Sequence, residues 1–435
     1  MAIASPNTTA NTTSAPSTGQ SYGAPLATVT TLFFMWGFLT CLNDILVPHL
    51  KAIFDLNYTR VMLIQFAFFG AYFIFSIPSA KIIDWMGYQR SMVLGLLTMG
   101  VGAFLFVPAA SVPSYPIFLG ALIVLAAGIT CLQVAANPYV TVLGKPETAS
   151  SRLNLTQAFN SLGTFLAPFF GGLLILSSAP KTADQIRAMA PDAALAYRLH
   201  EAATVKMPYV GLGIALVLLA VAIGSFKLPK IEHAQHKVGE KVNDSIWRHP
   251  NLIFGAIAIF VYVGAEVSIG SFLVNYFAQP EIGGLTEKVA ASFVAFYWGG
   301  AMVGRFIGSA LLQKMKTGGL LGICAICAAG LVAISMLTSG HFAMYSIILV
   351  GLFNSIMFPS IFTLGVAELG PLTGDGSGIM IMAIVGGAII PVAQGWIADH
   401  IGIHHAFFLP VICYVYILFF ALSGSKPNSE RYAKA

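Results

Sequence analysis

Three ionisable side chains lie inside long apolar segments of the sequence. Asp44 occurs in FFMWGFLTCLNDILVPHL, Glu266 in YVGAEVSIGSFLVNYF and Arg305 in VGRFIG. Such a group costs roughly 2.5–3.5 kcal/mol on insertion scales, so each one needs a function or a partner. Burial favours the neutral form of a carboxylic acid, which can then take up a proton on one side and release it on the other. We therefore interpret Asp44 as a proton- or cation-coupling group, with a structural hydrogen bond as the alternative.

The other two ionisable side chains have less specific surroundings. Glu266 can accept hydrogen bonds from a hydroxyl-rich ligand, couple an ion, or bond to a neighbouring helix. Arg305 lies near the end of its segment and is expected to form a structural ion pair with Glu368, in VAELG. Such a pair could open and close during a conformational cycle.

Amide side chains form a second set within the apolar segments. Gln133 and Asn137 are four residues apart, so they share one helix face. An amide both donates and accepts hydrogen bonds, which suits a ligand rich in hydroxyls, whereas bonding between helices is the alternative. We expect most of these groups to line a cavity, together with one aromatic ring that could stack on a sugar. The candidate binding residues are Asn43, Gln133, Asn137, Gln157, Asn160, Glu266, Asn275, Trp298 and Asn354.

A short charged turn separates two apolar segments in SAKIIDWMGYQR. Its Asp84, Gly87 and Arg90 have the spacing D-x-x-G-x-x-R. A carboxylate in this position can meet the positive amino end of a neighbouring helix. We interpret the turn as a conformational latch, together with Arg305 and Glu368, and not as a binding site.

The composition indicates the elements that must position these residues. Of 435 residues, 57% are hydrophobic and 9% are charged, against roughly 25% charged in ordinary soluble domains. A membrane-spanning helix needs about 20 apolar residues, and the backbone must be helical because lipid cannot satisfy its polar groups. Twelve spans are predicted, at 26–50, 61–83, 91–110, 115–141, 154–178, 208–227, 251–277, 288–313, 318–338, 342–367, 374–397 and 404–424.

The twelve spans divide into two halves that resemble each other. Gln133 aligns with Asn354 and Pro138 with Pro359, both at an offset of 221 residues. Internal repeats of this kind place a binding site between the halves near mid-membrane. The expected domains are a disordered tail (1–25), a first half (26–227), a linker (228–250), a second half (251–424) and a tail (425–435). Lys and Arg gather in alternate loops, which predicts that both termini are cytoplasmic.

Several function classes are disfavoured by what the sequence contains. It has no basic stripe on a soluble domain for nucleic acid, no nucleotide-binding loop and no plausible metal cluster. We therefore expect neither an enzyme nor a cofactor. The longest interior loop is too short for a signalling domain, which argues against a membrane sensor.

The turn at Asp84 and Gly87 resembles the signature loop of the major facilitator superfamily, with Ala80 at a position where that loop usually has glycine. The segments WGFLTCLNDILVPHLK, LQVAANPYVTVLG, YVGAEVSIGSFLVNYF and FNSIMFP resemble the fucose–galactose–glucose:proton symporter family. The resemblance implies two pseudo-symmetric six-helix halves and a sugar porter that works by alternating access. It also implies that Asp44 matches the family's proton-coupling aspartate.

The resemblance also bears on the substrate. Fucose permeases have a glutamate where this chain has Gln133, so the expected substrate is glucose or galactose. Proton coupling is expected, and sodium remains possible because one proton site is missing. The alternatives are fucose, N-acetylglucosamine or, less favoured, a drug exported in antiport. We expect a monomer in a bacterial inner membrane, with the sugar and the lipid bilayer as its partners.

Overall fold

The computed structural model describes residues 22–54, 58–111, 114–174, 185–186, 188–229 and 244–427, and within them the secondary structure is entirely helical. The long helices of the first half are α1 (Gly23–Phe54), α2 (Tyr58–Met86), α3 (Tyr88–Ser111), α4 (Tyr115–Val142), α5 (Ala149–Leu174) and α7 (Pro191–Ser225). Those of the second half are α8 (Pro250–Ala278), α9 (Glu287–Leu311), α10 (Thr317–Leu337), α11 (Gly340–Asn354), α12 (Met357–Gly365), α13 (Thr373–Met382), α14 (Gly386–Ile401), α15 (Ile403–Ala406) and α16 (Phe408–Phe419). Short turns of other helix types are η1 (Pro146–Thr148), η3 (Ile246–Arg248), η4 (Gly370–Leu372), η5 (Ala383–Val385) and η6 (Phe420–Gly424).

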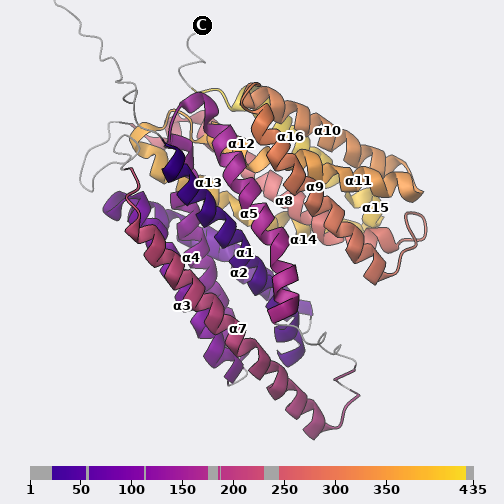
Figure 1. Cartoon of the computed structure of the whole chain (residues 1–435). Coiled ribbons are helices and arrows are strands. Elements are labelled where there is room, and N and C mark those ends of the chain that lie inside the picture. The colour runs from indigo at the N-terminus through magenta and orange to yellow at the C-terminus, as the bar shows by residue number, and fades with distance from the viewer. Residues whose placement is uncertain are drawn as a thin grey trace, which may run out of the picture.

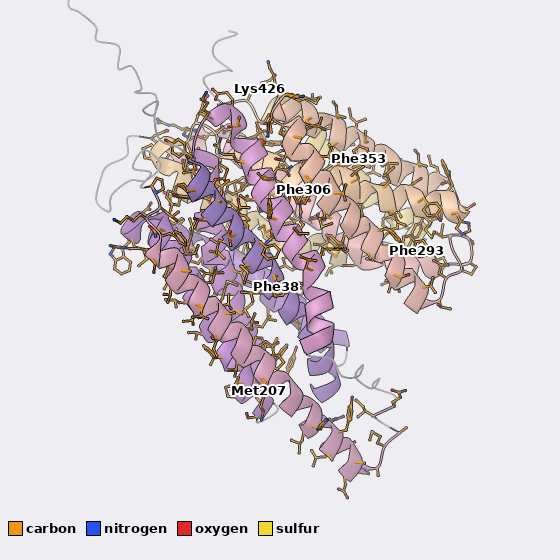
Figure 2. All side chains as sticks on the ribbon, viewed as in Figure 1. Phe38, Met207, Phe293, Phe306, Phe353 and Lys426 are labelled. Atoms are coloured by element: carbon orange, nitrogen blue, oxygen red, sulfur yellow. The ribbon has the colours of Figure 1, made fainter. Side chains whose placement is uncertain are left out.

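These helices form the twelve-span, all-α architecture that the sequence predicts. Ten helical segments of the described residues are long and apolar enough to cross a membrane. The other two spans are α1, which qualifies as a shorter apolar helix over Gly23–Leu39, and α5, which carries a polar stripe. Large apolar side chains cover the outer surface, as Met207 on α7 illustrates with 75% exposure (Figure 2). Lipid is the solvent that such a surface requires.

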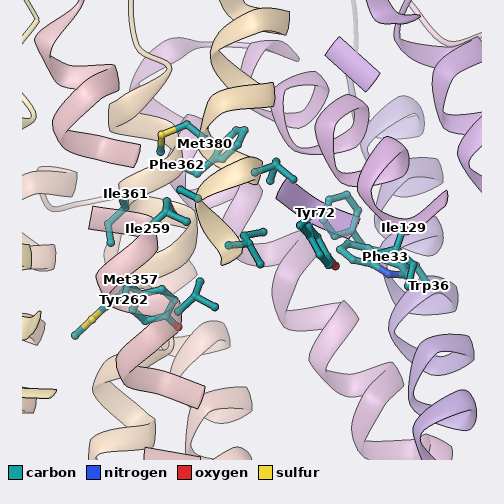
Figure 3. Close-up of a cluster of buried hydrophobic side chains, with 14 of the residues drawn as sticks. Phe33, Trp36, Tyr72, Ile129, Ile259, Tyr262, Met357, Ile361, Phe362 and Met380 are labelled. Atoms are coloured by element: carbon teal, nitrogen blue, oxygen red, sulfur yellow. The ribbon is translucent and has the colours of Figure 1, made fainter. Parts of the chain in front are cut away.

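Two groups of helices meet at one end of the molecule. Figure 1 shows the early helices in indigo and magenta and the late helices in orange and yellow, converging at the top of the view and spreading apart toward the opposite end. The main contacts between the groups pair α2 with α13, α5 with α9, α4 with α13 and α5 with α12. Buried apolar side chains of both groups form one cluster, which includes Phe33 and Tyr72 from the first half and Tyr262 and Phe362 from the second (Figure 3).

Two of the predicted spans are interrupted. The span expected at 342–367 consists of α11 and α12, which are separated at Ser355 and Ile356, where the backbone of Ile356 has φ −93° and ψ −7°. The span expected at 374–397 consists of α13, the turn η5 and α14. A break is tolerated at membrane depth only where other protein groups satisfy the freed polar atoms.

The helix α7 is longer than the sequence predicts. A loop is expected over 179–207 and a span from 208, whereas α7 begins at Pro191 and passes through Pro208. The apolar criterion misses this extension because its residues, PDAALAYRLHEAATV, are partly polar. They nevertheless favour a helix, since proline suits the first helical position, Asp192 faces the positive amino end and alanine has a high helix propensity.

The expected linker and tails lie mostly outside the described residues, namely 1–21, 230–243 and 428–435. At its carboxyl end, the linker has an ion pair between Asp244 Oδ2 and His249 Nε2 at 2.7 Å. The hydrogen bond from His249 holds the pKa of Asp244 below its ordinary value. This pair lies directly before Pro250, where α8 begins.

Glycines allow α3 and α4 to pack with their backbones in contact. A Cβ atom on Gly102 would lie 2.6 Å from the backbone nitrogen of Leu125, and one on Gly95 would lie 2.8 Å from that of Leu132. Small residues are the usual means by which membrane helices approach so closely.

Replacing Gly102 with valine should destabilise the first half by about 1–3 kcal/mol, because the added carbons overlap the backbone of α4. Thermal unfolding of the purified protein in detergent would measure the loss. Gly120→Val is the matched control, since a Cβ there meets nothing within 4 Å. Equal melting temperatures for the two variants would contradict this account of the packing.

Candidate functional site

Two of the candidate residues, Asn43 and Asp44, lie on the first span. Asn43 and Asp44 belong to the helix α1, but their side chains lie outside the described residues. Their position along α1 follows from the described part of the helix, in which Phe33 and Gly37 face α5.

The amides of α4 are deeply buried in the first half. Gln133 Nε2 donates to the hydroxyl of Tyr72 on α2 at 2.7 Å. Asn137 Oδ1 accepts from Gln157 Nε2 on α5 at 3.3 Å, and Asn137 Nδ2 has no hydrogen-bond partner. The two residues that share a face of α4 are therefore bonded to two different neighbouring helices.

The polar stripe of α5 joins this helix to three others. Besides the bond from Gln157 to α4, Asn160 Nδ2 donates to the carbonyl of Phe33 on α1 at 2.9 Å. Thr164 Oγ1 donates to the carbonyl of Gly37 at 3.3 Å. Ser161 Oγ accepts from the guanidinium of Arg305 on α9. The stripe therefore holds helices together, while the Asn160 side chain is partly exposed and keeps its Oδ1 atom for another donor.

A buried network surrounds Glu266 in the second half. The Tyr262 hydroxyl lies 2.8 Å from Glu266 Oε1 and 3.1 Å from the carbonyl of Asn354. Asn354 Nδ2 donates to the Tyr297 hydroxyl at 2.8 Å, and Asn354 Oδ1 accepts from the Tyr414 hydroxyl at 2.8 Å. Asn354 is fully buried, whereas the Glu266 side chain is partly exposed. Glu266 is therefore the least buried described residue of this network.

The aligned amides of the two halves have equivalent partners. Gln133 bonds to Tyr72 on α2, the second span of its half, and Asn354 bonds to Tyr297 on α9, the second span of the other half. The offsets are 354 − 133 = 221 and 297 − 72 = 225 residues. The similarity of the halves thus extends to their buried hydrogen bonds.

The remaining binding candidates are on the surfaces of α8 and α9. Asn275 is exposed near the carboxyl end of α8. Trp298 is 46% exposed on α9, and its ring lies 5.1 Å from that of Tyr297 in an edge-on arrangement. Of the set, Asn275 and Trp298 are therefore the most accessible described members on this half, and Glu266 is partly exposed.

Arg305 bonds to α5 and to the break between α11 and α12 instead of forming the expected pair with Glu368. Its guanidinium donates to Ser161 Oγ of the first half and, through Nε, to the carbonyl of Ser355 at 3.2 Å. Its charge also interacts with Glu266. Glu368 is exposed beyond the end of α12 and is not among the contacts of Arg305. The sequence alone could not select Glu266 as the acid near Arg305, because the two are 39 residues apart (305 − 266) on different helices.

Proline explains why the carbonyl of Ser355 is available to Arg305. In a helix, each backbone N–H bonds to the carbonyl four residues earlier, and proline has no N–H. Pro359 therefore leaves the backbone carbonyl of Ser355 without a helical hydrogen bond. The aligned Pro138 leaves the carbonyl of Val134 free in the same way. Ser377 Oγ, on α13 of the other half, donates to it at 2.8 Å. Each aligned proline therefore creates an acceptor that a side chain from another helix fills.

The charged turn lies where α2 meets α13. Gly87 has φ +82°, a conformation that favours glycine, and separates α2 from α3. Asp84 lies beside Gly374, in the first turn of α13, and Arg90 is exposed. Lys81 Nζ reaches Asp375 Oδ1 at 2.6 Å and Asp84 Oδ2 at 3.7 Å. Lys81 and Asp375 were missed by the sequence interpretation, although Lys81 lies within the same motif segment.

Hydroxyl side chains complete the contact between the halves. Ser151 Oγ on α5 donates to the carbonyl of Ser309 on α9 at 2.8 Å, and Ser309 Oγ donates to the carbonyl of Ser151 at 3.1 Å. Thr317 Oγ1 donates to Ser150 Oγ at 2.9 Å. We call the hydrogen-bonded contacts between the halves the inter-half seam. Its members are Lys81, Val134, Ser150, Ser151, Asn154, Ser161, Arg305, Ser309, Thr317, Asp375 and Ser377. Isolated serines and threonines carry no distinctive sequence pattern, so they could not be selected in advance.

The inter-half seam lies on the side of the molecule where the linker joins the halves. The residues that it uses fall near the end of α2, in the later part of α4, in the first half of α5, near the end of α9 and at the starts of α10 and α13. Aromatic packing adds to it, because the ring centroids of Phe159 on α5 and Phe306 on α9 are 5.7 Å apart. Among the described residues, no group of three His, Cys, Asp or Glu side chains could hold a metal ion.

Comparison with known proteins places this arrangement in context. Residues 26–384 match the family model described as Major Facilitator Superfamily. The chain is 54% identical to the glucose/galactose transporter of Brucella abortus (strain 2308), over 94% of this chain and 96% of that protein. It is 36% identical to the L-fucose-proton symporter of Escherichia coli (strain K12), over 92% and 93% of the two chains. The crystal structure of a transporter called FucP in the outward conformation matches with a TM-score of 0.86 at 34% identity, covering 94% of this chain and all of that one.

Proposed function

This chain belongs to the major facilitator superfamily, and we propose that it imports a hexose, glucose or galactose, by cation-coupled symport. The observation that carries this proposal is the 54% identity to a glucose/galactose transporter across nearly the full length of both proteins. The more distant relatives are named for fucose, and they are 36% and 30% identical. The expected order of substrates is therefore glucose or galactose first, with fucose or N-acetylglucosamine as alternatives within the same mechanism.

Coupling to a proton is the favoured mechanism, with Asp44 as the protonatable group and Glu266 as a second one. The relatives named as proton symporters support the choice of ion. Sodium is the alternative coupling ion. Position 133 on α4 has an amide, so α4 provides no second carboxylate to bind a proton. No cofactor is required, since the ion gradient supplies the free energy.

The sugar is proposed to bind between the halves, in contact with amides of the first half and with Glu266 and Trp298 on α8 and α9. The buried amides Gln133 and Asn137 form the inner wall, and Asn43, Gln157, Asn160, Asn275 and Asn354 complete the proposed set. A ligand shifts a conformational equilibrium only as far as it binds the two states unequally. Sugar and proton must therefore bind more tightly to the occluded state than to the open ones.

The proposed location is a bacterial inner membrane, with both termini in the cytoplasm. Lys and Arg gather in the loops on the side of the linker, which supports this orientation. The inter-half seam then closes the cytoplasmic side, and the site is accessible from outside. We propose that a monomer suffices, because the site lies between two halves of one chain, and that nucleic acid is not a partner.

The test is uptake of radiolabelled glucose and galactose into proteoliposomes under a proton gradient, a sodium gradient or neither. We expect a proton gradient to concentrate the sugar. Asp44→Asn should abolish that accumulation, at least tenfold, while sugar exchange at equal concentrations continues, because exchange needs no net proton release.

Each outcome of the uptake experiment tests one part of the proposal: the coupling ion, the role of Asp44 or the substrate. Accumulation driven only by sodium would keep the sugar and overturn the proton. Full accumulation by Asp44→Asn would remove Asp44 from coupling. If neither hexose moves under any gradient, the substrate proposal is wrong, and efflux of a drug from loaded vesicles would then favour an antiporter.

A further inference from the structure

One face of α9 continues from the inter-half seam toward the open end of the molecule. Trp298, Met302, Arg305 and Ser309 are spaced by four, three and four residues, so they share that face. Arg305 and Ser309 both bond to α5 of the other half. Trp298 therefore faces the first half as well, two helical turns farther from the closed end, and it is 46% exposed there.

The indole of Trp298 is held against α8 at a glycine. A Cβ atom on Gly270 would lie 3.0 Å from Cζ2 of Trp298 and 3.8 Å from its Cη2. The neighbouring Tyr297 ring packs edge-on, with an interplanar angle of 80°. Gly270 and Tyr297 thus fix the ring from two sides, and the exposed part of the indole is presented to the space between the halves.

A hydrogen-bond acceptor lies one helical turn away from this ring. Glu266 precedes Gly270 by four residues, so the two share a face of α8, about 6 Å apart along the helix axis. The Glu266 side chain is partly exposed, and Tyr262 orients it through Oε1. An apolar ring and a carboxylate at this separation match the face and the edge of a single pyranose ring.

We propose that Trp298 is a stacking platform for the apolar face of a pyranose and that Glu266 accepts hydrogen bonds from hydroxyls at its edge. This inference rests on the proposed sugar transport and names the chemical feature that the second half recognises. The axial 4-hydroxyl of galactose leaves a patch of C–H groups on the opposite face of the ring, which suits an indole. Glucose has equatorial hydroxyls all round and a less apolar face. The platform therefore favours galactose over glucose.

The first test measures half-saturation of galactose and glucose exchange in proteoliposomes. Trp298→Ala should raise the galactose KM about tenfold and Trp298→Phe about threefold, with the maximal rate largely kept, since lost stacking weakens binding. Gly270→Val should weaken galactose binding similarly by displacing the indole. The galactose preference should fall in all three variants. Trp396→Phe is the control, because Trp396 is also exposed, at 65%, but lies on α14 beside His400.

The second test leaves Trp298 in place. In a variant with the other four tryptophans replaced by phenylalanine, galactose should protect Trp298 fluorescence from acrylamide quenching, and an alditol without a ring should not. If wild type moves hexoses but the Trp298 variants keep their KM and galactose gives no protection, the platform is wrong and the transporter proposal stands. If wild type neither binds nor moves any hexose, the proposed function itself fails.

Discussion

Oxidation of a Ser151→Cys/Ser309→Cys variant should join the two halves and stop sugar uptake. The two serine Oγ atoms are 3.3 Å apart, and each hydroxyl bonds to the other residue's backbone. That spacing places the Cβ atoms near the separation that a disulfide requires. Because alternating access must separate α5 from α9, a covalent bond at this point should reduce uptake to background, measured with radiolabelled galactose.

Reduction with dithiothreitol should restore uptake, and neither single cysteine variant should respond to the oxidant. The single variants also control for the five native cysteines. Galactose should still bind to the oxidised double variant from the open end, since the inter-half seam is distant from Trp298. Continued uptake by a fully cross-linked protein would mean that the halves do not separate at the inter-half seam.

Removal of the Arg305 charge should destabilise the protein strongly. Arg305→Met leaves Glu266 without its compensating charge and leaves the carbonyl of Ser355 without its donor. Leaving a buried polar group without its hydrogen-bond partner typically costs about 1–3 kcal/mol, and the loss of the positive charge near Glu266 adds to that cost. Thermal unfolding in detergent should therefore show a large drop in melting temperature, together with loss of transport.

The double variant Glu266→Gln/Arg305→Met separates charge compensation from hydrogen bonding. It removes both charges, so it should recover most of the lost stability while active accumulation of sugar stays low. Additive losses in the double variant would show that the two charges do not interact, and the stabilising role of Arg305 would then lie in its bonds to Ser161 and Ser355.

The spans and their pairing into halves could be predicted from the sequence, because apolar length and internal repeats are properties of continuous segments. The alignment of Gln133 with Asn354 also anticipated equivalent environments, and both amides bond to tyrosines. Polar residues of α5 were recognised as a set, although their bonds run to three different helices. Periodicity identifies a helix face but not the neighbour that the face meets.

What the sequence could not predict depends on contacts between distant segments. The expected pair of Arg305 with Glu368 was wrong because the helix break at Ser355 and the approach of α5 provide nearer acceptors. The interruption of α11 and α12 was missed because an unbroken apolar run looks the same whether or not its backbone is continuous. The inter-half seam was missed because serines bond to whatever backbone lies within reach.

The free carbonyls left by Pro138 and Pro359 have a consequence for the speed of the transport cycle. When the closed end opens, Ser377 must leave the carbonyl of Val134, and no backbone N–H can replace it. A buried carbonyl without a partner costs about 1–3 kcal/mol, so water has to reach Val134 as the halves part. Wetting of this one position is then part of the barrier to opening, and turnover should slow when osmolytes lower the activity of water on that side of the membrane.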